Sequence, residues 1–420
     1  MKKLFPREFN AVQHHYLDTF IHHKKTNIMK HNKQFMAIAA IFSFFLFSCK
    51  KEIKTTSSED TLAVAATERI ASANAENKKG AAGYVYTLSN QIAGNSVLVY
   101  SRTADGTLKY VSSNPTGGTG TGGGLGNQGA VVLSEDNDLL LAVNPGSNSV
   151  SSFTISGGGL QWVSTVSSGG TKPVSVTMED HLVYVLNAGG SGNISGFNLH
   201  SDGSLHAIAG SSRPLSAASA GAAQISFVAD GNVVAITEKA TNKIITYTIK
   251  ANGTPGVMHS ITSVRPTPFG FAVGKNGIIY VSEAAGGAPG ASDVSSYYIS
   301  DNGMINLVDG PVVTGQSAAC WVLVTNNGKY VYATNTNSNN LSSFRAGHAG
   351  SLDVLNAIAA LTGNGSVPID AALSNNSKFL YVLNSGNQSM GAFSVDNDGS
   401  LSHIQNISGL PNGGTGLAAK

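Results

Sequence analysis

The sequence repeats one short pattern seven times, an aromatic residue followed by glycine six positions later. The seven pairs are Tyr100/Gly106, Phe153/Gly159, Phe197/Gly203, Tyr247/Gly253, Tyr297/Gly303, Phe344/Gly350 and Phe393/Gly399. Successive aromatic residues lie 53, 44, 50, 50, 47 and 49 positions apart. A period of this length is typical of an array in which each repeat is one supersecondary unit. We therefore predict seven equivalent structural units.

Each unit is predicted to form four short β-strands. In the last unit, segments 368–374, 379–384, 389–395 and 400–407 contain the apolar, β-branched and aromatic residues, and Asn, Ser, Gly and Asp cluster between them. This pattern indicates antiparallel hairpins. The repeated glycine is expected to take a positive φ in the turn between the third and fourth strands. The repeated aromatic residue is expected to pack between neighbouring sheets.

Seven four-stranded sheets around one axis form a β-propeller. We therefore predict an all-β, seven-bladed β-propeller with four strands per blade over residues 83–420. The first unit begins at residue 83 with a segment that matches the second strands of the other units. The chain ends in GGTGLAAK, which aligns with their first strands. The C-terminal strand is therefore expected to complete blade one and close the ring, which removes the free edges of a linear array.

The N-terminal segment does not follow the repeat. Residues 36–48 form an apolar run of 13, which basic residues precede and Cys49 follows. Such a run is too short to cross a bilayer as a helix and is typical of a signal peptide. The adjoining LFSC resembles the lipobox of bacterial lipoproteins, which implies lipidation of Cys49. A plain membrane anchor or a cleaved signal peptide without lipidation is the alternative.

We accordingly predict three segments before the propeller. Residues 1–28 are a leader extension and a candidate for a mis-assigned start, because Met29 would give a signal peptide of ordinary length. Residues 29–48 are the lipoprotein signal peptide, and residues 49–82 are the lipidated cysteine and a flexible tether. This organisation predicts an extracytoplasmic protein of the cell envelope that contacts the membrane only through its lipid anchor. In lipoproteins of this kind, a residue such as Lys50 after the cysteine implies the outer membrane.

Composition argues against several kinds of site. The chain has 26 Lys and Arg, 24 Asp and Glu and no basic stripe interleaved with aromatics, so no nucleic-acid binding is predicted. No histidines are paired at metal-ligand spacing, and neither a metal nor a cofactor is predicted. Gly118, Gly120 and Gly123 form a GxGxxG match without a following helix, which we interpret as a flexible inter-blade loop. Cys320 is interpreted as a buried apolar side chain.

One position of the repeat departs from its own pattern in two adjacent units. The residue expected to end the second strand is Asn90, Asn144, Asn187, Glu238, Glu283, Asn335 or Asn384. Carboxylates of Glu238 and Glu283 on neighbouring blades could act as acid and base, or bind sugar hydroxyls or a cation. The alternative is that each glutamate makes the hydrogen bonds of its turn and an ion pair with a neighbour such as Lys239.

The first strands of a propeller normally line its central channel. The residues expected there are Gln224, Phe269, Trp321 and Asp370, with Lys172 and Arg265 close by. An indole face beside a carboxylate suits a sugar or another ring with polar edges. Asp370 is the third catalytic candidate, and the candidate substrate-binding residues are Gln224, Arg265, Trp321 and Lys172. The alternative is a channel filled by packing and ordered water.

Residues 267–288 (TPFGFAVGKNGIIYVSEAAGGA), 318–336 (AACWVLVTNNGKYVYATNT) and 368–386 (PIDAALSNNSKFLYVLNSG) resemble the lactonase-like seven-bladed propellers. These proteins are grouped with 6-phosphogluconolactonase and 3-carboxymuconate cyclase. The resemblance covers nearly all of residues 83–420 and implies action on a cyclic ester. The phosphogluconolactonase branch has a Gly-Pro-Arg-His type first strand, whereas TKPVSV and GAAQISF here have no histidine. No catalytic residue is therefore carried over.

Two functions are compatible with these observations. The first is a membrane-anchored lactonase, with Glu238, Glu283 or Asp370 activating water and Arg265 or Lys172 holding an acidic lactone. The second is a non-catalytic propeller scaffold that binds a glycan, peptide or partner protein. Convergence of the two glutamates with a cation in one pocket would favour the enzyme. Carboxylates directed into solvent would favour the scaffold.

Overall fold

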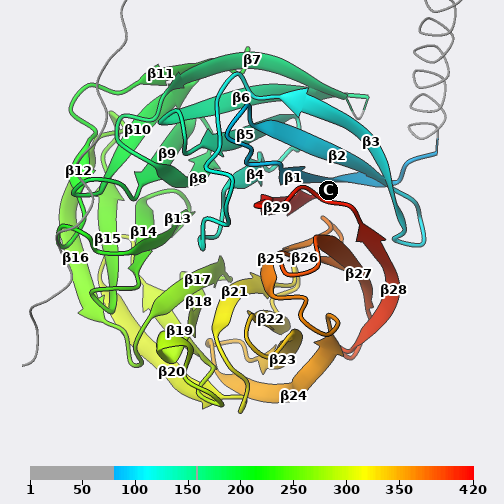
Figure 1. Ribbon diagram of the computed structural model, residues 1–420. Helices are drawn as coiled ribbons and strands as arrows, with labels where there is room; N and C mark the ends of the chain where they lie inside the picture. Colours follow the sequence, from blue (N-terminus) through cyan, green and yellow to red (C-terminus); the bar gives the residue numbers. More distant parts are fainter. Residues whose placement is uncertain (1–79, 158) are drawn as a thin grey trace, which may run out of the picture. The chain divides into compact units, whose positions relative to one another are not determined.

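Seven antiparallel sheets surround a central axis in the computed structural model, which describes residues 80–157 and 159–420 (Figure 1). Six sheets have four strands, and the third has an additional two-residue strand. The only helical element in these ranges is a single 3-10 turn, η1 (Ala285–Gly287), so no helix there is long and apolar enough to cross a membrane. The predicted all-β, seven-bladed propeller is confirmed. The predicted leader, signal peptide and Cys49 lie outside the described residues.

The strands of each blade are named here from the axis outward. Blade one has β29 (Thr415–Ala419), β1 (Gly83–Leu88), β2 (Ser96–Arg102) and β3 (Leu108–Pro115); blade two has β4 (Val131–Leu133), β5 (Leu139–Asn144), β6 (Ser149–Ser156) and β7 (Gly159–Ser167). Blade three has β8 (Pro173–Glu179), β9 (Leu182–Asn187), β10 (Asn193–Leu199) and, sharing the outer edge, β11 (Leu205–Ala207) and β12 (Arg213–Pro214). Blade four has β13 (Ala222–Val228), β14 (Val233–Glu238), β15 (Lys243–Ile249) and β16 (Pro255–Thr262).

The remaining three blades follow the same order. Blade five has β17 (Pro268–Val273), β18 (Ile278–Glu283), β19 (Asp293–Ile299) and β20 (Ile305–Val313). Blade six has β21 (Ala319–Val324), β22 (Tyr330–Asn335), β23 (Asn340–Ala346) and β24 (Leu352–Leu361). Blade seven has β25 (Pro368–Leu373), β26 (Phe379–Asn384), β27 (Ser389–Val395) and β28 (Leu401–Ser408).

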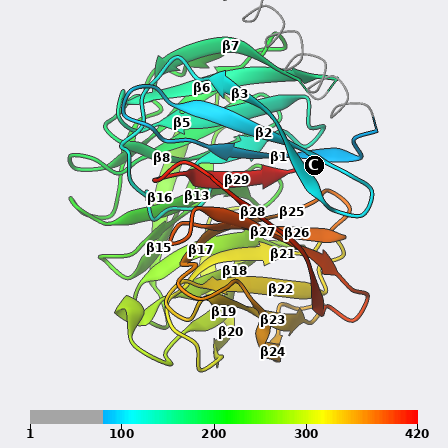
Figure 2. The same cartoon turned by 45° about the vertical axis from the view of Figure 1, so that its right-hand side comes forward.

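Blade one is built from both ends of the repeat region. The C-terminal β29 is its innermost strand and pairs antiparallel with β1, with Val85 opposite Ala419. The backbone N–H groups of Tyr84 and Lys420 each donate to the carbonyl of the other residue, at 3.2 and 2.8 Å. Figure 2 shows β29 lying beside β1. The predicted closure of the ring by the C-terminal strand is confirmed.

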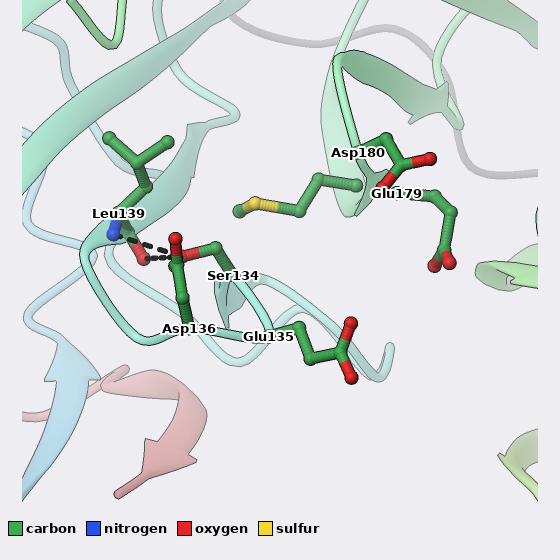
Figure 3. Close-up of a pocket in the computed structure, with 7 residues that line it drawn as sticks. Ser134, Glu135, Asp136, Leu139, Glu179 and Asp180 are labelled. Atoms are coloured by element: carbon green, nitrogen blue, oxygen red, sulfur yellow. Dashed lines mark hydrogen bonds between the residues drawn. The ribbon is translucent and has the colours of Figure 1, made fainter. Parts of the chain in front are cut away.

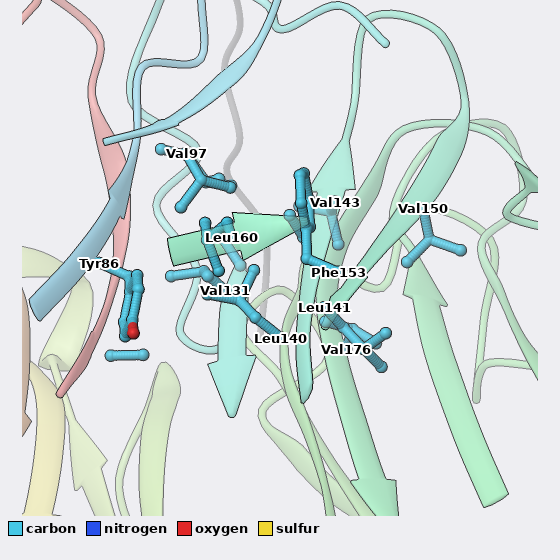
Figure 4. Close-up of a cluster of buried hydrophobic side chains, with 14 of the residues drawn as sticks. Tyr86, Val97, Val131, Leu140, Leu141, Val143, Val150, Phe153, Leu160 and Val176 are labelled. Carbon is cyan, nitrogen blue, oxygen red and sulfur yellow. The ribbon is translucent and has the colours of Figure 1, made fainter. Parts of the chain in front are cut away.

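The repeated aromatic residues lie on the third strands and are all buried, with exposed fractions of at most 4%. Figure 4 shows one cluster, in which Phe153 and Leu140 of blade two share a core with Val176 of blade three. Burial of each such side chain contributes about 1.5–3 kcal/mol. Because every blade packs on its neighbours in this way, the ring is stabilised by many small cores instead of one central core.

The repeated glycines allow neighbouring blades to pack closely at the turn between the third and fourth strands. Six of the seven have φ between +72° and +92°. At Gly106 a β-carbon would lie 2.4 Å from the ring of Phe379 in blade seven, so the neighbouring blade excludes a side chain there. The Gly106 carbonyl also accepts a hydrogen bond from the Tyr381 hydroxyl at 3.1 Å. Gly159 is the exception, because it begins β7 and Gly157 takes the positive φ instead.

Candidate functional site

A cavity of about 370 Å³ lies inside the ring of first strands. Its walls come from β4, β13, β21, β25 and β29, from the turns that follow β4 and β25, and from Gln128 and Gly129, which precede β4. These first-to-second-strand turns lie at one end of the channel, which we call the turn face. Glu135 and Asn375 are exposed in these turns and border the cavity. Gln224 and Asp370, two of the predicted channel residues, line its deeper part, so the structure brings these two candidates together.

Asp370 is a buried carboxyl group with an incomplete set of partners. Its side chain is 2% exposed, and Oδ1 accepts a hydrogen bond from the backbone N–H of Ala371 at 2.8 Å. Oδ2 has no hydrogen-bond partner in the described part of the chain. Burial raises the pKa of Asp370 well above its usual value, and the N–H groups of Ala371, Leu417 and Gly416 offset this only in part. Burial therefore favours the protonated form of Asp370, which has a proton to donate.

Two glutamine amides bind the inner edges of neighbouring blades. Gln224 donates Nε2 to the carbonyl of Phe271 at 2.9 Å and accepts from its N–H at 2.6 Å. Gln128 makes the same pair of bonds to Val322, at 2.9 and 3.1 Å. A first strand is the inner edge of its sheet, so its inward backbone groups lack a strand partner, and these amides supply one. Gln224 therefore lines the cavity with an amide that is already engaged.

The glycine-rich connection between β3 and β4 enters the channel, where residues 125–129 form what we call the plug (Figure 1). Asn127 donates Nδ2 to the carbonyl of Ala222 in blade four at 2.6 Å. Its own carbonyl accepts from the indole Nε1 of Trp321 in blade six at 3.1 Å. The plug precedes β4, so it lies at the end of the channel opposite the turn face. The segment is an inter-blade connection, as predicted, but it is bound across the ring instead of forming a loose surface loop.

The outer side of the plug carries an aromatic and cationic cluster. The rings of Phe269 and Trp321 lie 4.9 Å apart, and Nζ of Lys239 lies 4.6 Å from the Phe269 ring centre. Lys239 also donates to the carbonyl of Gly126 in the plug at 2.6 Å. Burial lowers the pKa of Lys239 to about 8. Cys320 is buried here as predicted, and burial raises the pKa of its thiol to about 11.

Glu238 is fully buried at the end of β14 and holds its turn together. Oε1 accepts from the N–H of Ser216 at 2.8 Å, and Oε2 accepts from the hydroxyls of Ser216 and Thr241. Lys239 makes other contacts, so the expected turn bonds form while the suggested ion pair does not. All partners of the carboxylate come from blade four and the connection before it.

Glu283 forms a buried pair of acids with Asp293, its partner across β18 and β19. Its oxygens accept from the hydroxyls of Ser263 (2.8 Å), Tyr297 (3.0 Å) and Ser295 (2.8 Å). Burial, followed by the hydrogen bond and charge of Asp293, raises the pKa of Glu283 well above its usual value.

Asp293 also has a raised pKa because of burial, which its bond to Glu283 and the charge of Arg265 offset in part. Nε of Arg265 lies 3.2 Å from Oδ2 of Asp293. Oδ1 of Asp293 is buried and has no hydrogen-bond partner among the residues described. A proton on Glu283 that is donated to Asp293 would satisfy both groups, and burial together with the charge of Asp293 favours this protonated form.

The other site candidates are therefore distributed over the ring. Glu238 and Glu283 are both fully buried, in separate networks, and no pocket or hydrogen bond of the described residues joins them. Trp321 binds the plug, and Arg265 binds Asp293. Lys172 is exposed, and its backbone N–H donates to Asn148. Whether any of these residues acts on a substrate stays a prediction.

The position at the end of the second strand is structural in most blades. Six of the seven asparagines and glutamates at this position end the second strand of their blade, and all seven side chains are buried. The six are Asn144, Asn187, Glu238, Glu283, Asn335 and Asn384. Asn90 is the exception in register, because it lies two residues beyond β1 with a φ of 50°. Its Nδ2 donates to Gly123 and Gly413, so it ties the glycine-rich connection to the C-terminal segment. Sequence alignment missed this shift because it does not show turn length.

A second pocket, of about 400 Å³, lies on the turn face at blades two and three (Figure 3). Glu135, Asp136, Glu179 and Asp180 supply four of its seven lining side chains. Burial raises the pKa of Glu179, and the charges of Asp180, Glu135 and Asp230 raise it further. This part of the rim is therefore negative. Within residues 80–157 and 159–420, no group of three or more His, Cys, Asp or Glu side chains is arranged to hold a metal ion.

Comparison with known proteins supports one family. The family model for lactonase, a 7-bladed beta-propeller, matches residues 75–217. The chain is similar in structure to a periplasmic gluconolactonase from Pseudomonas aeruginosa, with 16% identity and a TM-score of 0.61 over 79% of this chain and 98% of that chain. It is also similar to a candidate 6-phosphogluconolactonase from Bacteroides uniformis (19% identity, TM-score 0.61, 79% and 98% covered) and to a protein from Lactobacillus plantarum (17%, 0.63, 80% and 99%). No curated protein sequence matches the chain.

The structural likenesses, at these identities, show the fold alone. The family match adds sequence similarity over blades one to three. The match and the closed ring of seven four-stranded blades agree with the resemblance noted in the later blades. Over residues 75–217 the chain is similar to the lactonase family of 7-bladed beta-propellers, and its closed ring of seven blades has the fold of that family.

Proposed function

We propose that the protein is a lactonase that opens a cyclic ester in the channel cavity. The observation that carries this proposal is Asp370, a buried acid whose Oδ2 has no hydrogen-bond partner in the described chain, which lines that cavity and whose protonated form is favoured by burial. A protonated carboxyl in an apolar site is suited to donating a hydrogen bond to a carbonyl oxygen. Because Asp370 is 2% exposed, contact with a ligand requires rotation of the carboxyl about χ2, which is a soft torsion.

The proposed reaction uses Asp370 as the oxyanion stabiliser. Water attacks the lactone carbonyl carbon and forms a C–O bond, while the carbonyl electron pair moves to the oxygen that Asp370 holds. Glu135, the other carboxyl side chain in the cavity lining, is the candidate to accept the proton of that water. Collapse of the intermediate breaks the ring C–O bond, and the ring oxygen takes the proton back. The product is a hydroxy acid.

The buried states of Glu238 and Glu283 make them weaker candidates for this step. Each carboxyl is held by hydroxyl or backbone donors of its own blade and of the connection before it, and is fully buried. The names of structural relatives, a periplasmic gluconolactonase and a candidate 6-phosphogluconolactonase, agree in reaction type with a lactonase. Their low identity leaves the activity of this chain as a proposal.

We further propose that Cys49 is lipidated and that the propeller is held at the outer membrane on the extracytoplasmic side. The support is the apolar run of residues 36–48, the LFSC segment and Lys50. Incorporation of a labelled fatty acid that Cys49→Ser abolishes would agree with the anchor. Equal incorporation of the label by the wild type and by Cys49→Ser would refute lipidation of Cys49.

Turnover of a lactone panel by the full-length protein in detergent tests the activity. Asp370→Ala should lower kcat/KM by about 100–1000-fold, the usual effect of removing one oxyanion donor. Asp301→Asn, an exposed carboxylate in a hairpin turn of blade five, is the matched control and should keep wild-type rates. Wild-type protein that turns over none of the lactones would favour the non-catalytic scaffold, in which an ordered water satisfies Asp370.

A further inference from the structure

The plug and the cavity lining together restrict what the proposed active site can accept. We infer that the substrate is an uncharged lactone and that it enters from the turn face. This inference rests on the proposed lactonase function, and it concerns the same cavity. It follows from two independent features, the closure of one end of the channel and the charges along the wall.

The plug closes the end of the channel opposite the turn face. Gln128 reaches across the axis to Val322, and a β-carbon on Gly270 would lie 2.1 Å from Oε1 of Gln128. A β-carbon on Gly129 would lie 2.8 Å from Oγ of Ser175. The plug therefore packs against first strands β8, β17 and β21 without room for an added methyl group. A substrate that reaches Asp370 has to pass the turns instead.

The cavity wall offers nothing to pair with an anion. None of the lining residues is Lys, Arg or His, and the two ionisable side chains of the wall are Asp370 and Glu135. An anionic phosphate or carboxylate placed there would be desolvated without a counter-charge, which is costly. Hydroxyl groups of a neutral ring, in contrast, can exchange hydrogen bonds with the polar side chains of the wall, such as that of the exposed Asn375.

Cations do occur near the turn face, but they are engaged or lie outside the wall. Nζ of Lys420 donates to the carbonyl of Asn137 at 3.2 Å and contributes to the lowered pKa of Asp136. Lys329 and Lys378 end their turns and do not line the cavity. On the turn face at blades two to four, the acidic side chains of Glu135, Asp136, Glu179, Asp180 and Asp230 create a negative potential. This potential disfavours the approach of an anion.

The charge of the substrate can be tested with matched compounds. Glucono-δ-lactone, its 6-phosphate and a carboxylated γ-lactone are compared with full-length protein after correction for spontaneous hydrolysis. We expect kcat/KM for the uncharged lactone to exceed that for either anion by at least about 100-fold, as for burial of an unpaired charge. Glu179→Gln, in the acidic pocket beside the cavity, should reduce this discrimination, because it removes a negative charge from the rim without touching the proposed catalytic residues. A preference for either anion would overturn the inference.

The entry route can be tested by blocking one end at a time. Asn375→Cys borders the cavity on the turn face, and Ala240→Cys is exposed at the opposite end. A bulky thiol reagent should abolish turnover by the first variant and leave the second at wild-type rates. Wild-type protein treated with the same reagent is the control for the native thiols. Inhibition at Ala240→Cys instead would refute entry from the turn face.

Failure of the lactonase proposal can be told apart from failure of this inference. If no lactone is turned over, binding of glucono-δ-lactam, an uncharged analogue that is not hydrolysed in this way, is measured by calorimetry. The neutral lactam should then bind more tightly than its phosphorylated form, and Asp370→Ala should abolish this binding. That result would support an uncharged ligand even though the catalytic proposal fails. No binding of the neutral lactam, or tighter binding of the phosphorylated one, would refute the inference as well.

Discussion

Replacing Glu283 with glutamine should flatten the pH dependence of the stability of the propeller. Glu283 pairs with Asp293 inside blade five, where burial and that neighbour raise its pKa well above the value of the unfolded chain. The folded protein therefore keeps a proton that the unfolded chain releases near pH 4.5. Glutamine keeps the size of the side chain and offers an N–H donor toward Asp293, but it does not titrate.

The sign and size of the effect follow from proton linkage. Above pH 4.5 the folded state binds more protons than the unfolded state, so the wild-type free energy of unfolding falls as pH rises. The fall is about 1.4 kcal/mol per pH unit until the folded pKa of Glu283 is reached. This stabilisation is fully present below the unfolded pKa and is lost as pH rises through the folded pKa. Glu283→Gln removes this slope, so the difference in the free energy of unfolding between variant and wild type should grow as pH rises from 5 toward the folded pKa of Glu283.

The assay is urea unfolding of both proteins at pH 5, 6, 7 and 8, followed by tryptophan fluorescence. The difference between the two free energies cancels other groups, including Asp370, whose raised pKa acts in the same direction. Lys239 acts in the opposite direction above pH 8, because its pKa is lowered to about 8 and the folded state then holds fewer protons. Parallel curves for the two proteins would refute the reasoning, since they would mean that Glu283 is ionised in the folded protein.

Three further changes test other parts of the structure. Glu238→Gln should lower the free energy of unfolding by about 1–3 kcal/mol in urea titrations, because an amide N–H would face donors of Ser216 and Thr241; an unchanged midpoint would contradict this network. Gly270→Ala should cost about 1–3 kcal/mol and make Cys320 accessible to a thiol reagent as the plug shifts, whereas Gly123→Ala, with open space at its β-carbon, should do neither. Deletion of residues 415–420 should cost roughly 5 kcal/mol in calorimetry, because β29 and its pairing with β1 are lost, and a wild-type Tm would contradict ring closure.

The fold was predictable because the same contacts between neighbouring blades recur around the ring and require similar residues at equivalent positions of the repeat. The glycine six residues after each aromatic residue is required where a β-carbon would meet the next blade, as at Gly106 and Phe379. Six of the seven repeated glycines have the positive φ of this turn, and Gly157 has it in place of Gly159 in blade two. Ring closure was predictable because the chain begins with a second strand and ends with a first strand. The split outer edge of blade three was not, since β11 and β12 are only three and two residues long.

The candidate site was predictable only in part. Alignment of the repeats indicated Asp370 and Gln224 as channel residues, because first strands occupy equivalent positions. It also indicated Glu238 and Glu283, but their side chains are directed into separate hydrogen-bond networks, which depend on the turn and connection of each blade. The role of Gln128 was missed because the glycine-rich segment has no strand or helix period. Its path across the ring is set by contacts with distant blades, such as that with Val322.

The most direct test of the account is the pH profile of lactone turnover by the full-length wild type and by Asp370→Asn. If Asp370 acts as a neutral hydrogen-bond donor, kcat/KM of the wild type should fall tenfold per pH unit once pH exceeds the raised pKa of Asp370. Asp370→Asn keeps an N–H donor that does not titrate, so it should be slower and lack this fall. A wild-type profile whose high-pH limb persists unchanged in Asp370→Asn would contradict the assignment of the reaction to this cavity.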